Sequence, residues 1–174
     1  KCSRFLASLL ASLVLVGCNN KDNPTPPETP DPEIGPKADL ELVMDRTTKV
    51  LYYGDRKTEG VFNYYVGLGD KEFIKDNEGD DAAPADGHII FFDIYAQTIE
   101  TAVLPDGKYT IAETNAAGTL NNYYTRMQVN VEGKQTSVDF TEGYLEVKTS
   151  DKGKILKGLF TLKDGSTVSC IYEG

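Results

Sequence analysis

From residue 39 onward the chain alternates between short β-rich segments and turn signals, and this pattern limits the fold more than any other feature. The segments are rich in β-branched and aromatic residues and recur at roughly 8–12-residue intervals. No window keeps the 3.6-residue apolar period of a helix beyond a turn or two. The segments are "DLELVMD", "TKVLYYG", "VFNYYVGLG", "HIIFFDIYA", "KYTIAET", "YYTRMQVNV", "TSVDF", "YLEVKT", "KILKGLFTL" and "STVSCIYEG".

The residues between the segments are typical of tight turns. Pro105-Asp106-Gly107 is a proline-led turn whose glycine is free to take positive φ. Asp164-Gly165 and the segment 151–153 are predicted to be tight hairpin turns, and Glu132-Gly133 and Glu142-Gly143 are predicted turn points. The pattern therefore predicts one all-β domain over residues 39–174, an antiparallel β-sandwich of about nine or ten strands. A lipocalin-like β-barrel is the alternative. The segment 88–96 is apolar on both faces, which predicts a central strand.

The N-terminal residues are typical of an export signal. Lys1 and Arg4 precede the apolar run of residues 5–16, which is shorter than the ~20 apolar residues of a membrane-spanning helix. Residues 1–17 are therefore predicted to be a signal peptide. Leu15-Val16-Gly17-Cys18 resembles the lipobox of bacterial lipoproteins, which implies cleavage before Cys18 and acylation of its thiol. An ordinary signal peptide with a chance cysteine is the alternative. An acylated chain is anchored to the bilayer and does not span it.

Residues 18–38 form a proline-rich tract without an apolar pattern. Six of the eight prolines lie in it, so it favours extended polyproline II structure and is predicted to act as a semi-rigid stalk between the lipid and the domain. Loss of the signal leaves 16 basic residues against 27 acidic ones, a net charge of −11. A surface this acidic repels phosphate backbones and argues against nucleic-acid binding.

The three cysteines do not form a disulfide framework. Cys2 leaves with the signal and Cys18 is committed to lipid, so Cys170 is left alone. Cys170 shares one strand face with Val168 and Tyr172, and we expect a buried, unreactive thiol.

Several segments taken together resemble a known group of proteins. These are "YYGD", "GVFNYYVGLGD", "IIFFDIYAQ", "LPDGKYTI", "GTLNNYYTRM" and the terminal "GLFTLKDGSTVSCIYEG". Their order resembles small β-sandwich lipoproteins of gut Bacteroidetes. The resemblance implies a domain anchored to the outer membrane, exposed at the cell surface, with a role in adhesion or glycan handling. It supplies no functional residues.

The sequence offers little for catalysis. His88 is the one histidine, and it lies at the start of the most apolar segment, where a strand-entry role explains it. A zinc site needs several His or Cys ligands, and the domain has only His88 and Cys170. Acids are plentiful, so a carboxylate pair for glycoside cleavage stays open, but its separation is not readable from sequence. We predict a protein that is not an enzyme and needs no cofactor.

One acidic segment could hold a metal ion. Asp76, Glu78 and Asp80 alternate in "KDNEGDDAAPADG", and calcium prefers such hard oxygen ligands. The segment lacks the glycine at the sixth position and the distant glutamate of a calcium-binding loop. A solvated acidic loop is the alternative.

Three tyrosine pairs suggest a binding surface. Neighbours in a strand face opposite ways, so one residue of each pair can face outward. Tyr53, Tyr65 and Tyr124 are predicted to form an aromatic platform for a glycan or protein ligand. Tyrosines that fill the core are the structural alternative. A structural component of an envelope complex and a lipocalin-like carrier of a small ligand are the competing functions.

Overall fold

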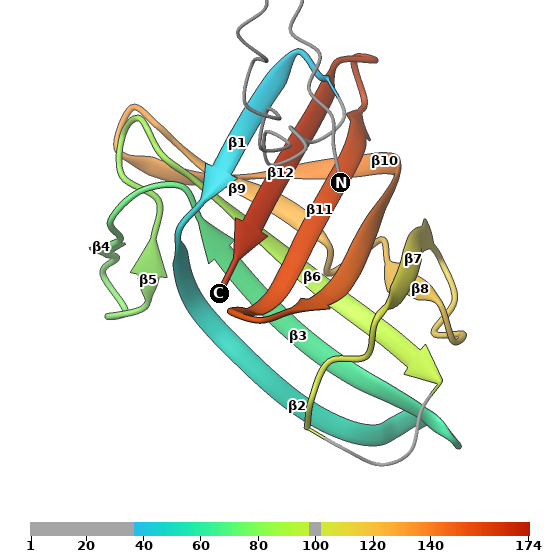
Figure 1. Cartoon of the computed structure of the whole chain (residues 1–174). Coiled ribbons are helices and arrows are strands. Elements are labelled where there is room, and N and C mark those ends of the chain that lie inside the picture. The colour runs from blue at the N-terminus through green and yellow to red at the C-terminus, as the bar shows by residue number, and fades with distance from the viewer. Residues whose placement is uncertain (1–36, 98–101) are drawn as a thin grey trace, which may run out of the picture. The chain divides into compact units, whose positions relative to one another are not determined.

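The computed structural model describes residues 37–97 and 102–174, apart from the side chains of Arg56 and Lys57, and these ranges contain strands and turns but no helix (Figure 1). Accordingly, a membrane-spanning helix is not found in them. The predicted signal peptide, Cys18 and the stalk up to residue 36 lie outside the described residues. The strands are β1 Leu40–Met44, β2 Arg46–Thr58, β3 Val61–Gly69, β4 Ile74–Lys75, β5 Asp81–Ala82, β6 His88–Gln97, β7 Gly107–Ala112, β8 Thr119–Asn121, β9 Arg126–Val131, β10 Lys134–Ser150, β11 Gly153–Leu162 and β12 Thr167–Glu173.

Ten strands form one sheet that folds over on itself. Its order is β1-β12-β11-β10-β7-β8-β6-β3-β2, and β9 pairs with both β10 and β6. Because β10 reaches β6 through β9 and also through β7 and β8, these five strands close a barrel. Neighbours are antiparallel except for β1 with β12 and β7 with β8. The strands β12 and β11 cross in front of β3 and β6 in Figure 1, and a separate hairpin of β4 and β5 lies to one side.

Strand β10 connects the two layers because it bends within its 17 residues. Its first part pairs with β9, and the part after Phe140 pairs with β11 and β7. The register shifts between Phe140 and Glu142, and Gly143 follows with φ of +143°. A Cβ on Gly143 would lie 2.5 Å from the Leu159 carbonyl oxygen, so glycine permits the close approach of β11. The predicted turn at Glu142-Gly143 is therefore wrong, because long-range pairing on both sides keeps the strand continuous.

The core contains one side-chain cluster that draws on both layers. The Phe160 ring lies 5.8 Å from the Phe92 ring of β6 and 4.5 Å from the Phe140 ring of β10, measured between centroids. The buried members are Leu42, Met44, Phe62, Tyr64, Val66, Leu68, Ile90, Phe92, Ile94, Ala96, Tyr109, Leu120, Met127, Phe140, Leu145, Val147, Leu156, Phe160, Val168 and Cys170. At roughly 25 cal/mol per Å² of apolar surface, this burial is the main stabilising term of the fold.

The predicted fold class is confirmed. The domain is all-β and mostly antiparallel, with a ten-stranded sheet, and its closed five-strand core fits the barrel alternative. β6 is a central strand, paired on both sides and almost wholly buried, as its sequence predicts. Cys170 is a free, buried cysteine, and burial raises the pKa of its thiol to about 12. The thiolate is therefore scarce at neutral pH, in agreement with an unreactive thiol.

Candidate functional site

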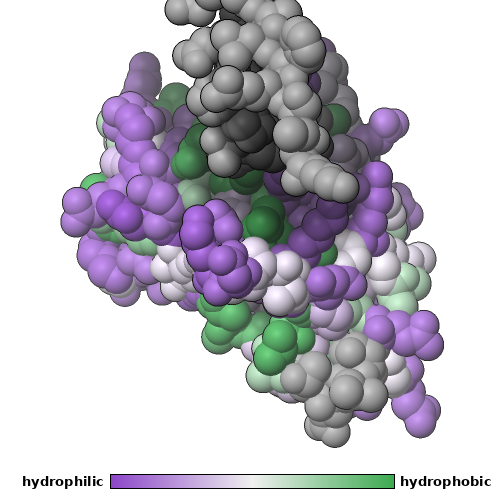
Figure 2. Space-filling model, viewed as in Figure 1, coloured by the Kyte–Doolittle hydropathy of each residue, from purple (hydrophilic) through white to green (hydrophobic). Residues whose placement is uncertain are grey.

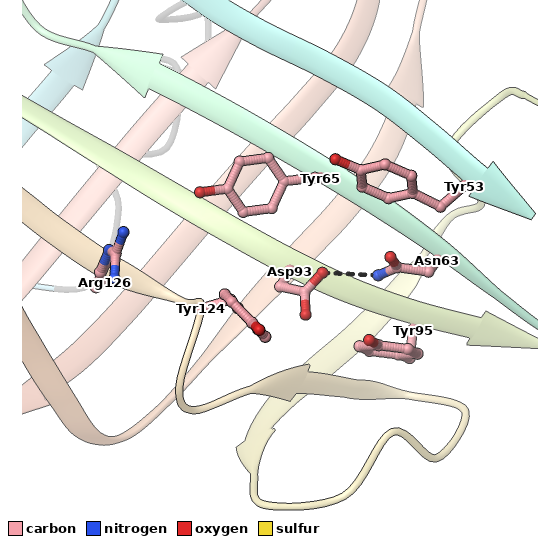
Figure 3. A pocket seen from close by; sticks show the side chains of 7 residues that line it. All are labelled: Tyr53, Asn63, Tyr65, Asp93, Tyr95, Tyr124 and Arg126. Atoms are coloured by element: carbon pink, nitrogen blue, oxygen red, sulfur yellow. Dashed lines mark hydrogen bonds between the residues drawn. The ribbon is translucent and has the colours of Figure 1, made fainter. Parts of the chain in front are cut away.

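The three tyrosines predicted to form a platform line one open cleft of about 650 Å³ (Figure 3). Tyr53 lies on β2, Tyr65 on β3, and Tyr124 in the turn before β9. The remaining residues that line the cleft are Asn63, Asp93, Tyr95 and Arg126. In Figure 3 Tyr53 and Tyr65 lie along one side, Tyr124 and Tyr95 lie along the other, and Asp93 and Asn63 lie between them.

Strand alternation places the cleft on the face of the sheet opposite the core. In β3, Tyr64 points into the core cluster and Tyr65 points into the cleft. Across the β3–β6 ladder, Tyr65 is opposite Asp93 and Asn63 is opposite Tyr95, so all four share one face. The prediction that the members of a strand tyrosine pair face opposite ways is confirmed here and in β2, where Tyr52 packs against the core.

Strand β2 has a bulge at Tyr53. Tyr52 is opposite Tyr64 and Gly54 is opposite Asn63, so Tyr53 is the extra residue in the ladder. Gly54 has φ of +69°, as in bulges that carry a left-handed glycine. Bulges re-aim side chains at the edge of a sheet, and here the Tyr53 side chain is 37% exposed at the border of the cleft.

The polar floor of the cleft is a buried amide–carboxylate pair. The Asn63 Nδ2 group donates to Asp93 Oδ1 at 2.7 Å and to the Ile94 carbonyl oxygen at 3.2 Å. Asn63 is 5% exposed and Asp93 is 4% exposed. Burial raises the pKa of Tyr95 to about 12, and the charge of Asp93 and a hydrogen bond to it add to the effect. Donors on both sides thus hold a buried carboxylate at the centre of the floor.

The turn between β8 and β9 builds the far side of the cleft. β6 pairs with β9 up to Phe91 and with β8 from Ile94, so the ladder is interrupted at Asp93. The Asp93 N–H instead donates to Oγ1 of Thr125, which is wholly buried, at 3.0 Å. The turn holds Tyr124 at the cleft with 45% of its side chain exposed. Tyr123 and Tyr124 were both predicted within a strand, which is wrong because this turn precedes β9.

Arg126 supplies the positive charge of the cleft and lies at one end of it in Figure 3. It is the first residue of β9 and half-buried. Burial raises the pKa of Tyr65, and the nearby Arg126 charge opposes that shift. None of the ion pairs among the described residues includes Arg126.

The predicted calcium-binding residues lie apart from the cleft, in the hairpin of β4 and β5. Asp76 Oδ1 accepts the N–H groups of Glu78 and Asp80, each at 2.9 Å, so this carboxylate closes its own turn. The Lys49 ammonium lies 3.8 Å from Asp80. In the part of the chain that the structure describes, no three acidic, His or Cys side chains are grouped to hold a metal ion. Figure 2 shows mainly hydrophilic residues over this hairpin.

The single histidine also lies outside the cleft. His88 Nδ1 is 2.8 Å from Asp70 Oδ2, and the His88 N–H donates to Asp70 Oδ1 at 2.7 Å. These two bonds connect the end of β3 to the start of β6. His88 therefore occupies the strand-entry position that the sequence predicts.

No family model, curated protein or solved structure matches this chain. The sequence assigned no place in a binding site to Asn63, Tyr95 and Arg126, and it favoured a solvated strand face for Asp93, which is wrong because Asp93 is buried. Asn63 and Asp93 did carry a signal, because each is a polar residue inside a segment that is otherwise apolar and aromatic.

Proposed function

We propose that this domain binds a glycan in the cleft and that the protein is a surface lipoprotein anchored through Cys18. The observation that carries the proposal is the arrangement of the cleft: four tyrosines surround a buried amide–carboxylate pair. Its volume of about 650 Å³ lies in the range of roughly 300–1,000 Å³ typical of small-ligand sites.

A sugar ring suits both parts of this site. Its C–H face packs on an aromatic ring, and tyrosine provides a rigid surface at low entropic cost. Its hydroxyl groups donate to a carboxylate and accept from an amide or a phenol, as Asp93, Asn63 and Tyr95 offer. The aromatic sides therefore supply contact area, and the polar floor fixes the orientation of the ring.

Two features support binding without catalysis or internal carriage. Glycoside hydrolysis uses two carboxyl groups about 5–9.5 Å apart, and Asp93 is the one carboxylate among the described residues that line the cleft. Core side chains such as Leu120 and Leu145 fill the interior of the closed barrel, which favours the outer cleft over a carrier with an enclosed ligand. We infer no cofactor, and any calcium at Asp76, Glu78 and Asp80 is outside this proposal.

A protein loop is the second candidate ligand. Tyrosine and arginine are enriched at protein interfaces. Tyr123, which packs edge-on against Tyr124 with centroids 4.8 Å apart, is 72% exposed beside the cleft. An extended protein surface would use Tyr123 as well, whereas a single sugar ring held in the cleft would not.

The proposal is tested by screening the full-length protein against oligosaccharides and then measuring Kd for alanine variants at Tyr53, Tyr65 and Tyr124. Each variant is expected to lose about 1–2 kcal/mol of binding, roughly 5- to 30-fold in Kd. Tyr144→Ala, outside the cleft, is the matched control and should leave Kd unchanged. Equal Kd values for the cleft variants and the wild type would refute the platform.

The anchor is tested separately in cells. Cys18→Ala should release the protein from the membrane fraction, because acyl chains contribute about 0.8 kcal/mol per buried CH₂ and hold the chain on the bilayer. Proteinase added to intact cells should remove the domain while a periplasmic marker survives. A protected domain would place it in the periplasm and would favour the envelope-complex alternative.

A further inference from the structure

Arg126 is the one cation among the described residues that line the cleft. Eight Lys and Arg side chains of the described surface lie within 4.0 Å of an Asp or Glu oxygen, and Arg126 is not one of them. The whole chain has a net charge of −9, so acidic partners are abundant. A half-buried guanidinium stays charged at every physiological pH. The cleft therefore holds a fixed positive charge that no ion pair of the described residues neutralises.

The acidic residue opposite Arg126 in the ladder pairs with another cation. Asp139 of β10 is directly opposite Arg126 in the β9–β10 ladder. Its carboxylate instead pairs with Lys163, whose Nζ lies 3.1 Å from Asp139 Oδ2. The other ladder neighbour of Arg126 is Phe91 of β6, which carries no charge. Neither ladder neighbour of Arg126 therefore forms an ion pair with its guanidinium, which lines the cleft.

A second hydrogen-bond donor is directed to the same end of the cleft. In Figure 3 the Tyr65 hydroxyl points toward the end where Arg126 lies, away from Tyr53. Tyr65 is held in place by its ring, which stacks on Phe91 with centroids 5.7 Å apart and planes 11° apart. A guanidinium and a phenol together suit a carboxylate, which accepts a bidentate pair from arginine and has further lone pairs for a hydroxyl donor. Asp93, at the centre of the floor, is an acceptor and suits the hydroxyl groups of the same ligand.

We propose that the ligand of the cleft is an acidic sugar whose carboxylate binds Arg126 and Tyr65 while its ring hydroxyls bind Asp93. This inference rests on the proposed glycan-binding function and specifies the class of sugar. One carboxylate per bound sugar fits Arg126, the single cation among the described residues that line the cleft. The acidic domain as a whole repels densely charged polyanions, which disfavours heavily sulfated chains.

The test uses matched oligosaccharides that differ only at C6 of one terminal hexose. Calorimetric titration of the full-length protein compares glucose with glucuronate and galactose with galacturonate. The 6-sulfates of glucose and galactose are included as a second kind of anion. The carboxylate member is expected to bind at least about tenfold tighter than the neutral member, the effect of one charge-assisted bidentate contact. Arg126→Gln should abolish that preference, so that the acidic and the neutral member bind with the same Kd. Arg126→Lys should keep only part of it, because lysine cannot form the planar bidentate contact.

Lys134→Gln is the matched control. Lys134 is an exposed cation on β10 that does not line the cleft, and its loss should leave the preference intact. Equal Kd values for neutral and acidic members would overturn the inference while the glycan-binding function stands. A preference that survives Arg126→Gln, or a stronger response to the sulfate, would also overturn it. Binding of no member, with a correctly folded protein, would overturn the proposed function itself.

Discussion

Removal of the Asn63 amide is the sharpest test of the cleft floor. Asn63 lies 30 residues from Asp93 in the chain, and its Nδ2 group bonds both the Asp93 carboxylate and the Ile94 carbonyl oxygen. Asn63→Ala breaks both bonds and leaves a buried carboxylate with fewer donors. We expect a lower free energy of unfolding, because burial of a charge is costly unless hydrogen bonds offset the loss of water.

The size of the loss follows from the two bonds. A hydrogen bond to a charged group contributes about 1.5–3 kcal/mol, and one between neutral groups about 0.5–1.5 kcal/mol. The 2.7 Å bond to Asp93 belongs to the first kind and the 3.2 Å bond to Ile94 to the second. Asn63→Ala should therefore destabilise the domain by roughly 2–4 kcal/mol. This is a large fraction of the roughly 5–15 kcal/mol that holds a typical domain folded.

Urea unfolding measured by circular dichroism gives this free energy, with an unchanged m-value as evidence that only stability has changed. A double-mutant cycle with Asp93→Ala isolates the pair and should give a coupling of about 1–3 kcal/mol. Asn130→Ala is the control, since the Asn130 amide bonds neutral backbone groups and should cost about 1–2 kcal/mol. A loss below about 0.5 kcal/mol for Asn63→Ala, or a coupling near zero, would refute the reasoning.

Two further predictions concern the scaffold. Hydrogen bonds from Lys154 and Thr149 hold the pKa of Asp106 down at about 2, below its usual 3.8. The carboxylate therefore contributes stability at neutral pH that is lost as the pH falls through that window, so Asp106→Asn should lower the melting temperature at pH 7 and least below pH 2. An equal loss at every pH would contradict this account. Gly143→Ala places a Cβ 2.5 Å from a backbone oxygen and should cost about 3 kcal/mol or more, whereas Gly165→Ala, with open space at φ of +86°, should cost only about 1–2 kcal/mol in a urea titration. Similar losses for the two glycines would show that strain at φ, and not the close approach, limits Gly143.

The sequence predicts strands well because their signals are local. Runs of apolar, aromatic and β-branched residues mark β3, β6 and β12, and the predicted turn at Glu132-Gly133 is confirmed with φ of 52° and 82°. Closure of the barrel has no local signal. It depends on β10 pairing with β7 as well as with β9, its neighbour in the chain, and on a glycine that bends the strand without ending it. The prediction of a turn at Glu142-Gly143 failed for that reason.

The cleft could be predicted only in part, for a related reason. The alternation of strand side chains was enough to place Tyr53 and Tyr65 outward. The polar floor depends on the register between β3 and β6, which brings Asn63 beside Asp93 across a 30-residue separation. Register is set by the hydrophobic faces of both strands together, so one segment read by itself does not reveal it.

Because strand side chains alternate between the core and the cleft, substitutions of exposed cleft residues should affect binding more than folding. Tyr53 and Tyr124 are 37% and 45% exposed, so their loss removes little buried area and should leave stability within about 1 kcal/mol of the wild type while binding falls. Asn63 and Asp93 line the cleft but are buried, so they contribute both to folding and to binding. Asn63→Ala should therefore weaken binding and folding together. A cleft that only exposed spare tyrosines would need no buried carboxylate beneath them, and the cost of holding one is the strongest physical argument that Asp93 has a ligand to orient.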